Sequence, residues 1–218
     1  MLCVMEQEAS TSAVNGPAVV RTGYDAIGER YHEWSHLSPT RLDFVDQVLH
    51  RLRPGSTVVD LGCGPGDPAT RMLVEHHTVL GVDVSMEQLR IARRLAPNAG
   101  LVQADLVDFS MQPRSVDAVV SFFALGHLPP DTHAPLLRRA ATWLRPGGML
   151  LTSAPLEAGS TVEESWLGVP MYFGGIGAAA TVQAVTDAGL VVESAREVAE
   201  DEGEDRTVTF LWVLATNP

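Results

Sequence analysis

The chain has 218 residues, of which 45% are hydrophobic and 19% are charged, a balance that is typical of a single globular domain. Its net charge of −12 repels phosphate backbones and anionic lipid headgroups, so nucleic acids and membranes are unfavourable partners. All 15 basic residues are arginine, and the absence of lysine excludes Schiff-base, pyridoxal-phosphate and P-loop chemistry.

The cysteines and the N-terminal residues indicate whether the protein binds a metal and where in the cell it is located. Cys3 and Cys63 provide neither a disulfide framework nor the spacing of a metal site. The segment Met1–Ser10 contains Glu6 and Glu8 and no positive charge, unlike a signal peptide. No apolar run approaches the roughly 20 residues that span a bilayer. We therefore expect a cytoplasmic protein that holds no metal.

The first two thirds of the chain alternate between strand and helix patterns. Residues 1–17 are mostly small and polar and are expected to form a flexible arm before a single domain over residues 18–218. Apolar spacing then predicts a helix over residues 42–52, which ends at Pro54-Gly55. Further along, the predicted strands are residues 57–60, 78–82, 101–104, 116–121 and 149–152, and the predicted helices are residues 67–74, 85–96 and 136–144.

The end of the chain follows a different pattern. After a long connection, residues 178–188 are predicted to form a helix, and residues 190–198 and 207–216 two strands joined by an acidic turn at Glu202–Glu204. Strands that alternate with helices predict a parallel sheet covered on both faces. Two strands joined only by a short loop must be antiparallel. We therefore predict an α/β fold with a doubly wound, mostly parallel sheet and one reversed strand near its edge.

The strongest local signal is the glycine-rich segment Asp60–Gly66, between a predicted strand and a predicted helix. Gly62, Gly64 and Gly66 allow a tight turn and let a ligand approach the backbone without meeting side chains. A plain strand-to-helix turn is the alternative, since a lone glycine pattern is weakly specific. The position of the segment favours ligand binding.

Acidic residues follow the next two predicted strands. Asp83 lies about 20 positions after the glycine turn, where a carboxylate can accept both ribose hydroxyls of an adenine nucleoside. Asp105 is placed to accept the adenine amino group, and Met86 to cover the adenine face. The alternatives are a helix cap or loop acid for Asp83, a turn aspartate for Asp105 and a core side chain for Met86.

Four segments together resemble the class I S-adenosylmethionine-dependent methyltransferases of the small-molecule type: Asp60–Gly66, Gly81–Ser85, Ala104–Leu106 and Leu144–Gly148. The resemblance implies a Rossmann-like seven-stranded sheet with a reversed last strand and S-adenosyl-L-methionine as cofactor. It also implies a lid helix that carries Tyr24 and Tyr31, for which ordinary amphipathic packing is the alternative. The cofactor-binding residues are then expected to be Tyr24, Tyr31, Asp60, Gly62, Gly64, Gly66, Asp83, Val84, Met86, Ala104, Asp105, Leu106 and Phe122.

A nicotinamide-dependent oxidoreductase on a similar sheet is a weaker hypothesis. Its turn reads Gly-x-Gly-x-x-Gly, whereas the third glycine here, Gly66, comes one position early and Asp67 follows. An aspartate at that point would repel a pyrophosphate. S-adenosylmethionine contains no phosphate, so it tolerates the acid.

The segment after the fourth predicted strand contains the candidate catalytic residue. This strand adjoins the first one at the switch point of the sheet, so the residues after it should face the transferred methyl group. His127 lies in this segment and its ordinary pKa suits a general base. A structural histidine that is hydrogen-bonded to the backbone is the alternative.

The long connection contains a dense aromatic cluster that ends in Gly174-Gly175. We expect a substrate flap near residues 157–177, with an apolar pocket lined by Trp166, Met171, Tyr172 and Phe173. The alternatives are that these side chains seal the sheet edge or form a homodimer contact.

The sequence therefore predicts methyl transfer to an oxygen, nitrogen or carbon atom of a small, hydrophobic metabolite, in keeping with secondary metabolism. A cofactor-binding protein without transferase activity is the alternative from another functional class.

Overall fold

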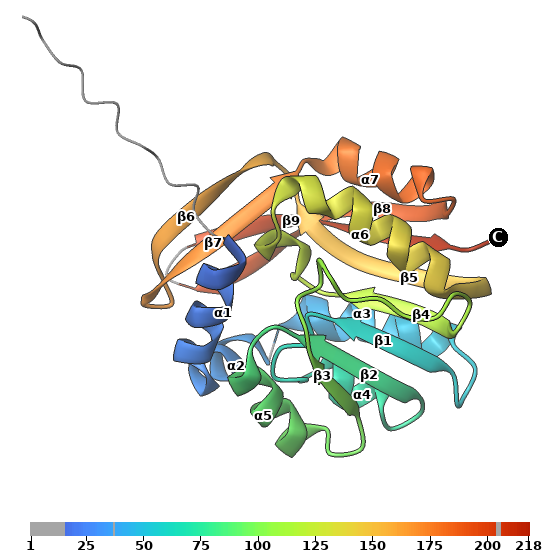
Figure 1. The fold of residues 1–218 in the computed structure, drawn as a ribbon, viewed down its shortest axis with the longest axis horizontal. Helices are drawn as coiled ribbons and strands as arrows, with labels where there is room; N and C mark the ends of the chain where they lie inside the picture. The colour runs from blue at the N-terminus through green and yellow to red at the C-terminus, as the bar shows by residue number, and fades with distance from the viewer. Residues whose placement is uncertain (1–15, 37, 204–205) are drawn as a thin grey trace, which may run out of the picture.

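The computed structural model describes residues 16–36, 38–203 and 206–218, which form an α/β structure around a seven-stranded sheet (Figure 1). The strand order is β3-β2-β1-β4-β5-β9-β8. In chain order its strands are β1 (Thr57–Leu61), β2 (Thr78–Asp83), β3 (Gly100–Gln103), β4 (Val116–Ser121), β5 (Leu144–Pro155), β8 (Val191–Gly203) and β9 (Arg206–Thr216).

The pairing confirms the predicted sheet. β1 to β5 pair in parallel, whereas β9 is antiparallel to both β5 and β8. β9 is reversed because a short turn joins it to β8, which leaves no room for a crossover helix. The central strands β1 and β4 are buried over most of their length, as expected for strands with helices on both faces.

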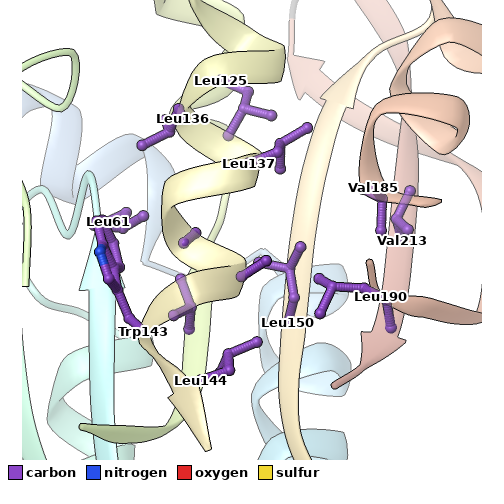
Figure 2. Close-up of a cluster of buried hydrophobic side chains, with 14 of the residues drawn as sticks. Leu61, Leu125, Leu136, Leu137, Trp143, Leu144, Leu150, Val185, Leu190 and Val213 are labelled. Atoms are coloured by element: carbon purple, nitrogen blue, oxygen red, sulfur yellow. The ribbon is translucent and has the colours of Figure 1, made fainter. Parts of the chain in front are cut away.

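The helices form a layer on each side of the sheet. They are α1 (Gly16–Ile27), α2 (Glu29–Ser35), α3 (Pro39–Arg51), α4 (Ala69–Leu73), α5 (Met86–Leu95), the short 3₁₀ helix η1 (Leu125–His127), α6 (Pro130–Trp143) and α7 (Ala178–Asp187). Side chains of α6 and α7 pack on one face and those of α3 and α4 on the other. Figure 2 shows the first of these clusters, where Leu136, Leu144 and Leu150 are almost fully buried. Each buried leucine contributes about 1.5–3 kcal/mol.

Three segments differ from the predicted elements. The helix α1 begins at Gly16, so the last two residues of the expected arm are helical, while residues 1–15 lie outside the described residues. The segment Arg145–Gly148 does not separate α6 from a later strand. β5 starts at Leu144, directly after α6, and a register shift against β4 accommodates the prolines and glycines.

The third difference is the long connection, where a substrate flap was expected near residues 157–177 and no strand was assigned. It contains the two-stranded antiparallel sheet β6 (Ala158–Trp166) and β7 (Val169–Ile176), which lies next to α1 in Figure 1. Leu167 and Gly168 form its two-residue turn with φ of 48° and 79°. This turn resembles a type I′ hairpin turn, but it lacks the Asn-Gly or Asp-Gly pair that marks such turns in sequences.

No helix within residues 16–36, 38–203 and 206–218 is long and apolar enough to cross a membrane.

Candidate active site

The glycine-rich segment turns the chain sharply between β1 and α4. Gly62 and Gly64 have φ of 73° and 54°, a backbone conformation that residues other than glycine rarely adopt. A Cβ atom on Gly62 would lie 2.3 Å from the Cβ of Ala124, so the two chain segments approach closely only because Gly62 has no side chain. A Cβ on Gly64 would instead face the ring of Tyr31 at 3.5 Å. No side chain therefore lies between the backbone of Gly64 and the ring of Tyr31 in α2.

Asp83 holds this turn from the end of β2. Its Oδ2 accepts a hydrogen bond from the Gly64 N–H at 2.8 Å, and its Oδ1 accepts one from the Ser85 N–H at 2.9 Å. Burial raises the pKa of Asp83 to about 6, although the backbone hydrogen bonds oppose that shift. Each carboxylate oxygen keeps a further lone pair, so Asp83 can still accept hydrogen bonds from a ligand.

A pocket lies between this edge of the sheet and the N-terminal helices. Its lining includes nine of the residues that were expected to bind the cofactor: Tyr24, Tyr31, Gly62, Gly64, Asp83, Val84, Asp105, Leu106 and Phe122. It also includes His127, Phe123, which follows Phe122 and is an equivalent candidate for a wall of the pocket, and residues that were not foreseen, Pro17, Val20, Ala124 and Leu128. Segments that follow β1, β2, β3 and β4 therefore meet at one pocket, as the carboxyl ends of parallel strands do.

Four expected residues lie elsewhere. Asp60 is buried and accepts a hydrogen bond from the Thr70 hydroxyl at 2.6 Å, and burial raises its pKa to about 6. The missing Cβ of Gly66 leaves room for Ala92 of α5. Met86 is 41% exposed, and neither it nor Ala104 is among the residues that line the pocket. Asp60 and Gly66 therefore stabilise the turn through contacts with α4 and α5, on the side away from the pocket.

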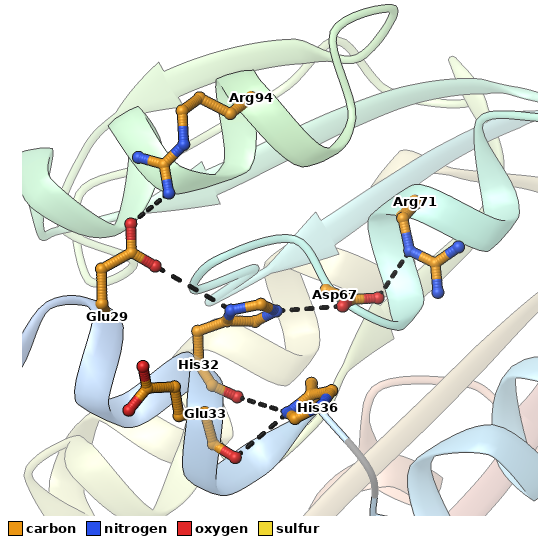
Figure 3. A network of polar contacts seen from close by, with 7 residues as sticks. All are labelled: Glu29, His32, Glu33, His36, Asp67, Arg71 and Arg94. Atoms are coloured by element: carbon orange, nitrogen blue, oxygen red, sulfur yellow. Dashed lines mark hydrogen bonds and ion pairs between the residues drawn. The ribbon is translucent and has the colours of Figure 1, made fainter.

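The helices α1 and α2 cover the pocket, and polar contacts attach them to the domain at several places, including α5 and the glycine-rich turn. At α5, Asp25 accepts hydrogen bonds from the Ser85 hydroxyl at 2.6 Å and from the Glu87 N–H at 3.2 Å. At the glycine-rich turn, His32 contacts Asp67 at 3.0 Å, as Figure 3 shows.

The second attachment is part of a larger polar network (Figure 3), in which Asp67 also pairs with Arg71, and Glu29 pairs with Arg94 of α5. Burial alone would raise the pKa of Asp67, but hydrogen bonds from His32 and Arg71 lower it below its ordinary value. The ionised carboxylate of Asp67 is therefore favoured at the point where α2 meets the turn.

His127 connects the lid to the β6–β7 hairpin. One ring nitrogen, Nδ1, lies 2.9 Å from the backbone carbonyl of Tyr172, and the other, Nε2, lies 2.8 Å from the Tyr24 hydroxyl. Because a carbonyl can only accept, we assign the proton to Nδ1, and Nε2 then accepts the hydrogen bond of Tyr24. Burial lowers the pKa of His127 to about 4 and raises that of Tyr24 well above its usual value. Both groups are therefore neutral at pH 7.

A second, larger cavity of about 1380 Å³ adjoins the pocket. Residues of α2, α3, β6, β7, β8 and β9 line it. Four residues line both spaces: Tyr24, Tyr31, Phe123 and His127. The two spaces therefore lie side by side, and Tyr24 and His127 form part of the boundary between them.

The four aromatic and methionine residues of the expected flap divide into two pairs. Trp166 and Phe173 line the large cavity, with ring centroids 5.8 Å apart. Met171 and Tyr172 are buried beneath α1, where the Cβ positions of Gly23 and Gly16 would lie 2.7 and 3.0 Å from their side chains. The second pair joins the hairpin to the lid helix.

Several residues of the cavity were missed by the sequence analysis, among them Arg41, Glu200, Arg206 and Phe210. Arg41 donates to the Tyr31 hydroxyl at 2.9 Å and lies over the ring of Phe123. These residues come from α3 and from the β8–β9 hairpin, far apart in sequence. Phe123, which follows β4, has a φ of 65°, which is unusual for a bulky residue.

Comparisons with known proteins agree with this arrangement. Residues 58–148 match the family described as Methyltransferase domain. A trans-aconitate 2-methyltransferase from Azoarcus sp. is 42% identical over 107 residues, which are 48% of this chain and 41% of that protein. A 27-O-demethylrifamycin SV methyltransferase from Amycolatopsis mediterranei is 31% identical over 157 residues, which are 62% of this chain and 57% of that protein. The chain thus spans about half the length of these relatives.

A solved structure supports the same family. The S-adenosylmethionine-dependent methyltransferase from Mesorhizobium loti is 26% identical, with a TM-score of 0.63, and the match covers 78% of this chain and 96% of that one. Over residues 58–148 the chain is similar to the methyltransferase domain family, and its fold is similar to that of this S-adenosylmethionine-dependent methyltransferase. The family's cofactor is S-adenosyl-L-methionine.

The residues of the pocket fit this cofactor chemically. Asp83 provides a buried carboxylate for hydroxyl groups, and the bare backbone at Gly64 leaves space that a Cβ would fill. Leu106 and Phe122 provide apolar walls. When bound, S-adenosylmethionine supplies a methyl group that is already activated on a sulfonium.

Proposed function

We propose that this methyltransferase transfers the methyl group to an oxygen, nitrogen or carbon atom of a small molecule with an apolar body, bound in the large cavity. The observation that carries this proposal is that the two spaces are adjacent and share lining residues. Because Tyr24, Tyr31, Phe123 and His127 line both, a group bound in the pocket can face one bound in the cavity. Such alignment of the reactants is the main contribution of a protein to methyl transfer.

In this proposal the cofactor-binding residues have separate roles. The Asp83 carboxylate accepts hydrogen bonds from the ribose hydroxyls, and the Asp105 carboxylate accepts one from the adenine amino group. The backbone at Gly62 and Gly64 contacts the amino-acid end of the cofactor. Tyr24 and Tyr31, whose ring centroids are 5.0 Å apart, cover the reactants and exclude water.

We assign His127 a positioning role. Both of its ring nitrogens are engaged, and its lowered pKa makes it a weak base. By accepting the hydrogen bond of Tyr24, His127 leaves the lone pairs of the tyrosine oxygen directed away from the imidazole. The Tyr24 oxygen can then accept a hydrogen bond from the attacking group of the acceptor.

The walls of the cavity favour an acceptor with a flat or apolar body. Trp34 and Trp166 line it with ring centroids 5.7 Å apart, and Phe173 and Phe210 line it as well. Aromatic rings bind such bodies by burying their surface and by edge-to-face contacts. The two curated relatives are named for small organic acceptors, which supports the same size class.

The test has two stages. Calorimetric titration with S-adenosylhomocysteine first measures whether the cofactor pocket binds. Incubation with methyl-labelled S-adenosylmethionine and a small-molecule extract should then yield a labelled product, and the Asp83→Ala variant should yield none. Binding without transfer to any fraction of the extract would favour a cofactor-binding protein without transferase activity.

A further inference from the structure

Among the described residues, two buried polar atoms in the wall of the large cavity have no hydrogen-bond partner. They are the hydroxyl of Ser35, which is 2% exposed, and Oε1 of Glu200, which is 9% exposed. Both residues line the cavity, and neither lines the cofactor pocket. The other oxygen of Glu200 accepts a hydrogen bond from the Ser38 hydroxyl at 3.0 Å. Because unpaired buried polar atoms are costly, these two atoms indicate a ligand that hydrogen-bonds to them.

The charges around the cavity indicate the sign of that ligand. Glu157, Glu163, Glu200, Asp201 and Glu202 line it, against only two arginines. The guanidinium of Arg206 contacts both oxygens of Glu163 at 2.8 and 3.0 Å and also Glu202 at 3.1 Å.

The second arginine is engaged as well. Arg41 donates to the Tyr31 hydroxyl and lies 4.6 Å from the centre of the Phe123 ring. Within the described part of the chain, Glu200 takes part in none of the ion pairs. A cationic donor on the ligand would supply the partner that the protein does not provide.

Aromatic side chains of the same cavity suit a cation. Trp34 is adjacent to Ser35 in α2, and its indole N–H donates to the backbone carbonyl of Glu202 at 3.0 Å. Trp34 is thereby held between α2 and β8, the two elements that contribute Ser35 and Glu200. The indole face of tryptophan is the aromatic surface that binds ammonium groups best.

We propose that the methyl acceptor carries a cationic amino group, which Glu200 and Ser35 bind in the part of the large cavity that lies outside the cofactor pocket. This inference rests on the proposed function, since it names the class of acceptor for the same site. The amino group is a recognition element, and the methylated atom lies at the other end, beside the cofactor pocket.

The experiment compares three probes of similar shape and different charge: phenethylamine, phenylethanol and phenylpropionate. Calorimetry is performed on the protein saturated with S-adenosylhomocysteine. Phenethylamine should bind about tenfold more tightly than phenylethanol, because a hydrogen-bonded ion pair replaces an uncharged contact. In Glu200→Gln this preference should disappear.

Matched variants control for charge and folding. Glu197→Gln removes the same charge from an exposed position of the same strand and should retain the preference for the amine. Ser35→Ala should weaken phenethylamine binding by a smaller factor than Glu200→Gln. Equal affinity for the three probes, tighter binding of the acid or no binding of any probe would overturn the proposal. Failure of S-adenosylhomocysteine to bind would instead contradict the proposed function itself.

Discussion

The pocket and the large cavity share four residues but are built in different ways. The floor of the pocket comes from short segments that follow adjacent parallel strands, and much of it is backbone, as at Gly62 and Gly64. The cavity is formed by side chains from two lid helices, α3 and two hairpins that are distant in sequence. The pocket depends on a few glycines and one carboxylate. The large cavity is lined by side chains, which can be substituted without altering the sheet.

The largest effect is expected at the closest backbone approach. Gly62→Ala should lower the free energy of unfolding by about 3 kcal/mol, because it adds left-handed strain and a collision with Ala124. Urea denaturation measures this change. Gly147→Ala is the matched control, because Gly147 has φ of 78° and nothing within 4 Å of its Cβ position, so it should lose only about 1 kcal/mol. Equal losses would remove the close approach as the reason for Gly62.

Asp83→Asn tests the carboxylate of the pocket. The amide group cannot accept hydrogen bonds at both positions, so one of the Gly64 and Ser85 N–H groups loses its acceptor, and the ribose loses a charged one. Affinity for S-adenosylhomocysteine should fall about a hundredfold. An exposed control on the same domain, Asp187→Asn, should bind normally. Unchanged affinity in the Asp83 variant would remove this residue from the cofactor site.

His127 and Tyr24 lie at the junction of the two spaces and should act as one unit. If His127 positions Tyr24, then His127→Ala and Tyr24→Phe should each lower the rate constant for transfer about tenfold, and the double variant should lose little more. The pH profile of the rate should keep its shape. A loss of about 10²–10⁴-fold confined to His127→Ala, with a changed pH profile, would assign it the role of general base.

The raised pKa of Asp83 predicts that pH affects cofactor affinity and stability in opposite directions. Ribose hydroxyls donate to the ionised carboxylate, so S-adenosylhomocysteine affinity should fall about tenfold per pH unit below pH 6. The folded-state pKa lies above the ordinary value of 3.8, so Asp83 reduces the stability of the free protein as pH rises from 3.8 to about 6. Titrations and urea denaturation across this range measure both. Asp83→Asn should flatten the affinity curve, and a curve that keeps its slope would contradict the assignment.

The smallest effect is expected in the wall of the cavity. Trp166→Phe keeps an aromatic surface but reduces its area, so the Michaelis constant for the acceptor should rise about threefold, with unchanged S-adenosylhomocysteine affinity. Trp143→Phe, at the buried end of α6, should lower stability and leave this constant unchanged. A weaker cofactor affinity in Trp166→Phe would show that the wall also shapes the pocket.

The glycine-rich turn, Asp83 and the reversed strand could be predicted because local sequence determines them. A glycine at positive φ, an acid at the end of a buried strand and a short turn between two strands each constrain the neighbouring backbone directly. The same local signals could not separate the pocket-facing Gly64 from the supporting Gly66. Both have positive φ, and only the position of Ala92 on α5 shows that Gly66 faces a helix.

The sequence by itself determined the alternation of strands and helices in the parallel part of the sheet and which residues follow its strands, because hydrophobic periodicity and backbone conformation act over a few residues. Only the tertiary structure decided that Trp166 lines the cavity while Met171 packs beneath α1, and that Glu200 lies buried beside the N-terminal helices. These placements depend on how the β6–β7 and β8–β9 hairpins pack against elements more than 100 residues away in the chain. No local pattern carries that information.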